Sequence, residues 1–239
     1  MSSIPDYPSI PWNETLYKQV EEDDLFAFTV TNLNQCFDGR EEALLDFIHT
    51  HPNISNLRNN PSAILDTIDE FGRTKDFLMT LGPAKRGIIK SLMAEQRPKV
   101  LMDVGAYVGY SALTLGCIVL DLYPGAKSSE VKVFSFEKEP KCAAITSSFV
   151  ELAGLKGVVD VVVGSADVEF RRLTEEGTLT SVDMLLLDHW EKLYVDDLKV
   201  VEELGLLKEG SVIVADNVVC PGAPEYLEYV RGGKASEKP

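Results

Sequence analysis

Short apolar runs alternate with longer amphipathic stretches through the second half of the chain. Val100-Leu101-Met102 is one such run, and it is followed by a glycine-containing turn and then by a stretch long enough for a helix. Runs of this kind are typical of strands that are buried on both faces of a parallel sheet. The predicted strands are Lys99–Val104, Val131–Glu137, Val158–Val163, Met184–Leu187 and Ser211–Ala215. The predicted helices are Ser111–Leu122, Glu139–Ala153, Ala166–Glu175 and Val195–Glu203.

The first hundred residues have a different pattern. Residues 1–40 contain Pro5, Pro8 and Pro11 and are expected to be an irregular extension. Helices are then predicted at Glu41–His51, at Ser62–Phe71 and within Met79–Glu95, where Pro83 marks the entry. We therefore expect one domain over 41–239, with a helical cap at 41–98 and an α/β core at 99–239. Alternating strands and helices in the core predict a doubly wound parallel sheet with right-handed crossovers.

Charge and composition narrow the class of protein. Acidic residues number 38 against 23 basic ones, a formal net charge of -15, and such a surface repels phosphate backbones. We expect no nucleic-acid partner. The four cysteines are scattered with no zinc-type spacing, which favours reduced thiols. The N-terminus lacks a signal-peptide pattern, and no apolar run reaches the ~20 residues that span a bilayer. The expected location is cytoplasmic, with no membrane contact.

The turn after the first predicted strand has features of a nucleotide-type binding site. Asp103 lies near the end of the strand, and Gly105 and Gly109 follow it. No lysine follows Gly109, which excludes a phosphate-binding P-loop, and Tyr107 stands where a dinucleotide fingerprint needs glycine. The remaining pattern, acid-x-Gly-x-x-x-Gly, is typical of S-adenosylmethionine-dependent methyltransferases. A purely structural turn between strand and helix is the alternative.

Glu137 ends the second predicted strand, where an acid can accept hydrogen bonds from ribose hydroxyl groups. The alternative is a role at the start of the following helix. Two later strands end in Asp188 and in Asp216-Asn217. Acids at strand ends can simply form turns. Adjacent strands of one sheet, however, bring their ends together, and two carboxylates with an amide oxygen form a set of ligands suited to Mg²⁺.

Several longer strings resemble the catechol O-methyltransferase family over roughly Ala63 to Arg231. They are Gly105-Ala-Tyr-Val-Gly-Tyr-Ser111, Lys141-Cys-Ala-Ala-Ile-Thr146, Leu204-Gly-Leu-Leu-Lys208 and Ala215-Asp-Asn-Val-Val-Cys-Pro-Gly-Ala-Pro224. The resemblance implies a Rossmann-like methyltransferase fold and Mg²⁺-dependent transfer of a methyl group from S-adenosylmethionine to a catechol hydroxyl. Asp188, Asp216 and Asn217 match the magnesium ligands of that family.

The same resemblance implies roles for other residues. Met79 would lie beside the cofactor, and Tyr107 and Ser111 near its methionine portion. Ala166, Asp167 and His189 would border the adenine, although Asp167 is equally expected to be the N-cap of the next helix. Phe77, Trp190 and Pro221 would flank the catechol ring, with core packing as the alternative for the two aromatic residues. The predicted cofactor-binding set is Met79, Asp103, Gly105, Tyr107, Ser111, Glu137, Ala166, Asp167, Asp188 and His189. The predicted substrate-binding set is Phe77, Trp190, Asn217 and Pro221.

The sequence departs from the family at two places. The position of the family's general-base lysine holds Glu191 here, and Lys192, one residue later, is the candidate base. The family also continues beyond this C-terminus into two more strands, so a sheet without the usual C-terminal strand pair is expected, with an open edge that could pair with a second copy. These departures keep two alternatives open: a non-catalytic protein that binds S-adenosylmethionine, and a methyltransferase for another phenolic substrate.

Overall fold

The computed structural model describes residues 38–125 and 130–232, all of which belong to the unit Phe37–Pro239. The irregular extension expected over residues 1–40 lies almost entirely outside the described residues. Within them, strands and helices alternate from Val100 onward, as the sequence predicts. None of the described helices is long and apolar enough to cross a membrane.

A five-stranded parallel sheet forms the centre of the unit, in the order β3-β2-β1-β4-β5. Its strands are β1 (Val100–Val104), β2 (Lys132–Glu137), β3 (Val159–Val163), β4 (Val182–Leu187) and β5 (Leu207–Ala215). From β1 the chain adds β2 and β3 on one side, and it then returns to add β4 and β5 on the other side of β1. This arrangement confirms the predicted doubly wound fold. In such sheets ligands bind at the carboxyl ends of the strands, near the reversal between β1 and β4.

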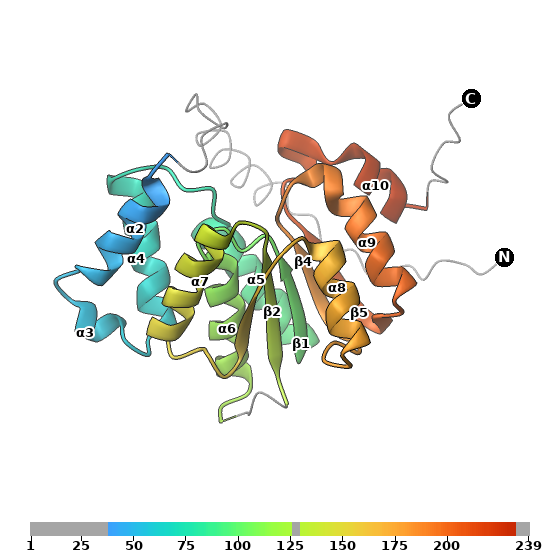
Figure 1. Cartoon of the computed structure of the whole chain (residues 1–239), viewed down its shortest axis with the longest axis horizontal. Helices are drawn as coiled ribbons and strands as arrows, with labels where there is room; N and C mark the ends of the chain where they lie inside the picture. The colour runs from blue at the N-terminus through green and yellow to red at the C-terminus, as the bar shows by residue number, and fades with distance from the viewer. Residues whose placement is uncertain (1–37, 126–129, 233–239) are drawn as a thin grey trace. The chain divides into compact units, whose positions relative to one another are not determined.

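Side chains that alternate along each strand build two separate apolar layers. Leu101 on β1 and Leu186 on β4 pack with the helices α2 to α7, whereas Met102 and Leu187 pack with α8, α9 and α10. Figure 1 shows these two groups of helices flanking the sheet. The bounds of the helices around the strands are α6 (Tyr110–Leu122), α7 (Pro140–Leu152), α8 (Ala166–Glu175), α9 (Tyr194–Glu203) and α10 (Pro224–Val230). Burial on both faces explains why the strands read as continuous apolar runs.

The helical cap has four helices where the sequence predicts three. They are α2 (Arg40–His49), α3 (Ile54–Leu57), α4 (Pro61–Thr74) and α5 (Gly82–Gln96). The short α3 carries no sequence periodicity long enough to predict it. At α4 the Asn60 side chain accepts a hydrogen bond from the N–H of Ala63 at 3.1 Å, and Pro61 occupies the first helical position. This arrangement satisfies a donor that the helix itself leaves unpaired.

The chain from β4 onward holds the clearest differences from the sequence-based prediction. β5 begins at Leu207 rather than Ser211, because its pairing with β4 shifts register between Val182 and Met184. A 3₁₀ turn at Glu191–Leu193 (η1), a wider turn at Val218–Gly222 (η2) and the helix α10 were not predicted. These short turns have too few residues to show a period, so sequence patterning does not reveal them.

Candidate active site

The glycine turn after β1 packs directly against the end of β4. Gly105 has a φ of +105°, and a Cβ atom there would lie 2.3 Å from the carbonyl oxygen of Asp188 and 2.9 Å from the Cα of His189. Only glycine fits, both because of this close approach and because of the positive φ. The turn predicted to hold the cofactor and the acid predicted to bind metal are thus neighbours.

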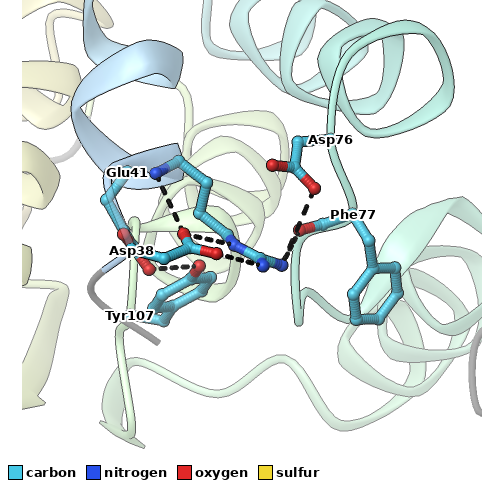
Figure 2. Close-up of polar contacts among 6 residues, drawn as sticks. Asp38, Glu41, Asp76, Phe77 and Tyr107 are labelled. Atoms are coloured by element: carbon cyan, nitrogen blue, oxygen red, sulfur yellow. Dashed lines mark hydrogen bonds and ion pairs between the residues drawn. The ribbon is translucent and has the colours of Figure 1, made fainter. Parts of the chain in front are cut away.

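Tyr107 fixes the shape of the same turn through three hydrogen bonds. It has a φ of +46°, and its backbone N–H donates to Glu137 Oε2 at 2.7 Å. Its carbonyl accepts from the Thr146 hydroxyl at 3.0 Å. Its own hydroxyl donates to Glu41 Oε1 at 2.7 Å, as Figure 2 shows. The turn is therefore tied to β2, to α7 and to the cap helix α2.

A second group of contacts connects α2 with the segment that carries Phe77. The guanidinium of Arg40 donates to the carbonyl oxygen of Phe77 at 2.7 Å and to Asp38 Oδ2 at 2.6 Å, and it lies 3.9 Å from Asp76 Oδ1 (Figure 2). Its hydrogen bonds lower the pKa of Asp38 to about 2. Sequence reasoning missed Arg40 and Glu41, because no local pattern relates them to partners 37 and 66 positions away.

Glu137 lies half-buried at the end of β2. Besides the Tyr107 N–H, its carboxylate accepts the N–H of Glu139, the N-cap residue of α7, at 2.8 Å. Burial raises the pKa of Glu137, and the two backbone donors oppose that rise. The acid thus stabilises both the glycine turn and the start of α7. Its role toward a ribose stays a prediction, and the helix-start alternative has geometric support.

Asp103 is fully buried beneath the glycine turn. Its Oδ2 accepts from the Ser135 hydroxyl at 2.6 Å and from the Ser111 hydroxyl at 3.0 Å. Burial raises the pKa of Asp103 to about 6, and the two serine donors oppose that rise. Within the described residues its Oδ1 has no hydrogen-bond partner. Ser111, predicted near the methionine portion of the cofactor, directs its hydroxyl into this buried group.

The residues predicted around the adenine lie at two strand ends. Ala166 and Asp167 begin α8, whose N-cap is Ser165, so the interpretation of Asp167 as the N-cap is wrong. Asp167 is instead an exposed acid in the first helical turn. His189 Nε2 lies 2.7 Å from Asp197 Oδ2, and its ring centroid is 5.1 Å from that of Tyr194. Asp197, on α9, was not predicted; it fixes the orientation of the imidazole.

Asp188, Asp216 and Asn217 do come together. Leu187 and Ala215 are register partners, and the N–H of Asp216 donates to the Leu187 carbonyl at 2.9 Å. Burial and the adjacent negative charges of Asp216 and Asp103 raise the pKa of Asp188 well above its usual range. Nowhere in residues 38–125 and 130–232 do three or more His, Cys, Asp or Glu side chains form a metal-binding cluster. The predicted set has two carboxylates, and its third donor is an amide.

A lysine that was not predicted contacts this group. Lys85, on α5, places its ammonium 3.0 Å from Asp216 Oδ1, 3.1 Å from Asp216 Oδ2 and 3.4 Å from Asn217 Oδ1. The three oxygen atoms thus already hold a positive charge, which shows that their arrangement suits a cation. No sequence signal marks Lys85, since it is separated from its partners by 131 and 132 positions.

Comparison with known proteins gives the family. Residues 59–226 match the O-methyltransferase family. Catechol O-methyltransferase of Bos taurus is 36% identical over 228 residues, which cover 95% of this chain and 75% of that protein. Catechol O-methyltransferase of Sus scrofa is 40% identical over 158 residues, or 66% of this chain and 81% of that protein. The chain belongs to the catechol O-methyltransferase family.

Solved structures of O-methyltransferases share the fold. TomG from Streptomyces achromogenes, solved with S-adenosylmethionine, has a TM-score of 0.58 and 18% identity, with 90% of this chain and 86% of that chain covered. The Bacillus cereus O-methyltransferase, solved with S-adenosylhomocysteine, has a TM-score of 0.57 and 19% identity, covering 87% and 85%. These structural similarities show that the present chain has the same Rossmann-like architecture as the two solved enzymes.

The predicted acceptor-binding residues of this O-methyltransferase lie on three separate segments. Phe77 is half-buried in the connection before α5, where Met79, which is predicted to lie beside the cofactor, is 41% exposed. Trp190 is 60% exposed after β4, which contradicts core packing for this side chain, and Pro221 is exposed in η2. Trp190 therefore lies outside the core, and its role toward an acceptor stays a prediction.

The two candidates for the general base are consecutive residues of the short turn η1, which directly follows Trp190. Lys192 is exposed, and its ammonium lies 5.2 Å from the centre of the Trp190 ring, a distance typical of a cation–π contact. Glu191, the first residue of η1, is partly buried. In a 3₁₀ turn, consecutive side chains point about 120° apart. The two residues therefore cannot both face the same acceptor.

Proposed function

We propose that this O-methyltransferase transfers the methyl group of S-adenosylmethionine to a hydroxyl of a catechol in a Mg²⁺-dependent reaction. The observation that carries the proposal is the contact between Gly105 and Asp188, since it joins the cofactor turn to the cation-binding oxygens. The relatives named catechol O-methyltransferase support the acceptor class, and the solved structures with bound S-adenosyl compounds support the cofactor. A cytoplasmic location remains a prediction.

The glycine turn and Glu137 would hold the cofactor. Glu137 already accepts hydrogen bonds from the Tyr107 and Glu139 N–H groups, and a carboxylate has capacity for about four. The remaining capacity suits two ribose hydroxyl groups. Because the turn is fixed by Glu137, Thr146 and Glu41, it is arranged before any ligand arrives, which lowers the entropic cost of binding.

Asp188, Asp216 and Asn217 would hold the magnesium ion. When bound, the ion would polarise the two neighbouring oxygens of a catechol and stabilise the negative charge of the ionised form. The carboxylate and amide oxygens are of the kind that this metal prefers, and the contact of the Lys85 ammonium with Asp216 and Asn217 supports the proposal. Phe77, Trp190 and Pro221 would orient the ring so that one oxygen lies in line with the methyl group.

The weakest part of the machinery is proton removal. A carboxylate is intrinsically a weaker base than an amine, and the phenol that must lose its proton has a pKa of about 10. Glu191 is therefore a poorer base than the lysine that the family has at this position, and Lys192 remains our candidate. This departure also favours the alternative of a protein that binds S-adenosylmethionine with little turnover; a methyltransferase for another phenol is the third possibility.

The test is a methyl-transfer assay with S-adenosylmethionine and catechol, with Mg²⁺ or with excess chelator, alongside calorimetric titration of the cofactor. We expect slow turnover that needs Mg²⁺ and cofactor binding that does not. Cofactor binding without turnover would establish the non-catalytic alternative, and turnover only with other phenols would establish the third. Turnover that survives chelation would disprove the metal assignment.

The assignment of the base is tested by exchanging the two side chains. We expect the wild-type rate to rise with pH, since the phenol must lose its proton, and the double variant Glu191→Lys, Lys192→Glu to be faster at neutral pH. A lost general base costs about 10²- to 10⁴-fold, which bounds the gain. Turnover that is abolished in Glu191→Gln but kept in Lys192→Ala would instead make Glu191 the base.

A further inference from the structure

Lys85 is placed where a cation is unfavourable for its own helix. It is the fourth residue of α5, and the N-terminus of a helix carries a partial positive charge. Its stabilising partners therefore come from elsewhere in the fold. They are the Asp216 carboxylate, contacted through both oxygens at 3.0 and 3.1 Å, and Asn217 Oδ1 at 3.4 Å.

The carboxylates around this ammonium repel one another. Asp188 and Asp216 directly follow two adjacent strands whose last residues, Leu187 and Ala215, are register partners, so two like charges lie close together at this edge of the sheet. The Lys85 ammonium places a positive charge against the Asp216 carboxylate. The side chains of Lys85 and Asp216 are only 16% and 13% exposed, so solvent screens the interaction incompletely. The ammonium thus offsets part of the charge that a divalent cation would offset.

A divalent cation and this ammonium cannot share the site. Metal–oxygen distances for Mg²⁺ are about 2.0–2.1 Å, so an ion on Asp216 and Asn217 would sit beside the ammonium that contacts the same atoms. Two like charges so close, in a partly buried site, repel strongly. The four-carbon stem of lysine lets its ammonium swing away, whereas the strand ends that carry the two ligands are fixed by the sheet.

We propose that Lys85 is an internal counter-cation: it neutralises the Asp188–Asp216–Asn217 group before a divalent cation binds, and it leaves these oxygens when the ion enters. Lys85 thereby lowers the affinity of the site for the ion and keeps the two strand ends together in its absence. The inference rests on the proposed metal site, and it concerns how this chain tunes that site.

The test is a titration of the full chain with Mn²⁺, followed by electron paramagnetic resonance of the free ion. Lys85→Met should bind Mn²⁺ about tenfold more tightly than wild type, a factor equal to about 1.4 kcal/mol, because no charge-assisted contact has to be broken. The matched control is Lys90→Met, which removes the same charge from the same helix but from an exposed pair with Asp121. It should leave the affinity within a factor of two to three of wild type.

Two further measurements guard against a variant that merely folds poorly. Lys85→Arg keeps the charge and can hold Asp216 with two parallel hydrogen bonds, so it should bind Mn²⁺ more weakly than wild type. Thermal unfolding in chelator should show Lys85→Met less stable than wild type, and added Mg²⁺ should remove that deficit. Lys90→Met should show neither effect.

The outcomes separate this inference from the proposed metal site. If the wild type binds Mn²⁺ and Lys85→Met binds it equally well or more weakly, the counter-cation role is overturned, because Lys85 then does not compete with the ion. The metal site would stand in that case. Absence of Mn²⁺ binding in wild type, Lys85→Met and Lys90→Met alike would overturn the metal site, and the counter-cation role with it.

Discussion

At the scale of single residues, one carboxylate serves two parts of the fold. Glu137 accepts the N–H of Tyr107 in the glycine turn and the N–H of Glu139 at the start of α7. The same side chain is the predicted acceptor for a ribose. A residue with both functions is expected to affect ligand affinity and the shape of the turn, and the two effects can be measured separately.

Glu137→Ala is expected to weaken S-adenosylmethionine binding by about ten- to a hundredfold, since a hydrogen bond to a charged group contributes roughly 1.5–3 kcal/mol. Glu137→Gln retains one oxygen acceptor for the turn, so it separates loss of charge from loss of the turn. Calorimetric titration gives the dissociation constants, and Glu139→Gln, an exposed acid two positions on, is the control. Unchanged affinity in both Glu137 variants would leave this acid only its helix-start role.

At the scale of elements, β5 differs from the other strands. Among the described residues it pairs only with β4, and its side chains are half-buried or exposed along their whole length, whereas β4 is largely buried. An open strand edge presents unpaired backbone groups that can bind another strand. We therefore predict that this edge pairs with a second copy of the chain.

We expect the chain to associate as its concentration rises, with the amide protons of Leu207–Ala215 becoming protected at the same time. Light scattering reports the association, and hydrogen exchange followed by mass spectrometry reports the protection. Val182–Leu187, inside the sheet, is the internal control and should exchange slowly at every concentration. A monomer whose β5 amides already exchange slowly in dilute solution would show that the edge is covered within the chain.

At the scale of the whole molecule, a buried acid should make stability depend on pH. Asp103 is fully buried, and its pKa rises from a usual value of 3.8 to about 6. The folded state therefore binds this proton more tightly than the unfolded state does. Protonated Asp103 contributes its full stabilisation at a pH below 3.8, and this contribution is lost as the pH rises through about 6. A rise of the pKa from 3.8 to about 6 corresponds to about 3 kcal/mol of folding free energy.

Asp103→Asn should remove this contribution. Between about pH 4 and pH 7 we expect the free energy of unfolding of the wild type to fall relative to that of Asp103→Asn. The stability of Asp103→Asn relative to the wild type should therefore increase as the pH rises. Urea denaturation at several pH values in the presence of chelator measures it. Asp196→Asn, an exposed acid on α9, is the control and should show no such trend. Parallel pH curves for wild type and Asp103→Asn would mean that Asp103 is not protonated in the fold.

Local patterns in the sequence predict the alternating core, the glycine turn and the acids at the strand ends. These features depend on the periodicity and spacing of residues that are close together in the sequence, so they can be recognised without the structure. Val100–Val104 and Lys132–Glu137 are rich in apolar residues because both faces of the sheet are covered. Gly105 is glycine because the backbone there has a positive φ and closely approaches Asp188, the residue after β4. The resemblance implies the metal-ligand roles that we propose for Asp188, Asp216 and Asn217, and the sheet register brings these residues together.

Which charged side chains face one another depends on long-range contacts of the folded chain. Lys85, Glu41 and Arg40 lie on the cap helices, and their partners lie 131, 66 and 37 positions away, so no local pattern relates them. The earlier start of β5 likewise depends on a register shift against β4. Long-range contacts and register are set by packing of the whole sheet and its cap. The local sequence around a residue can indicate its function, but its long-range partners are known only from the folded structure.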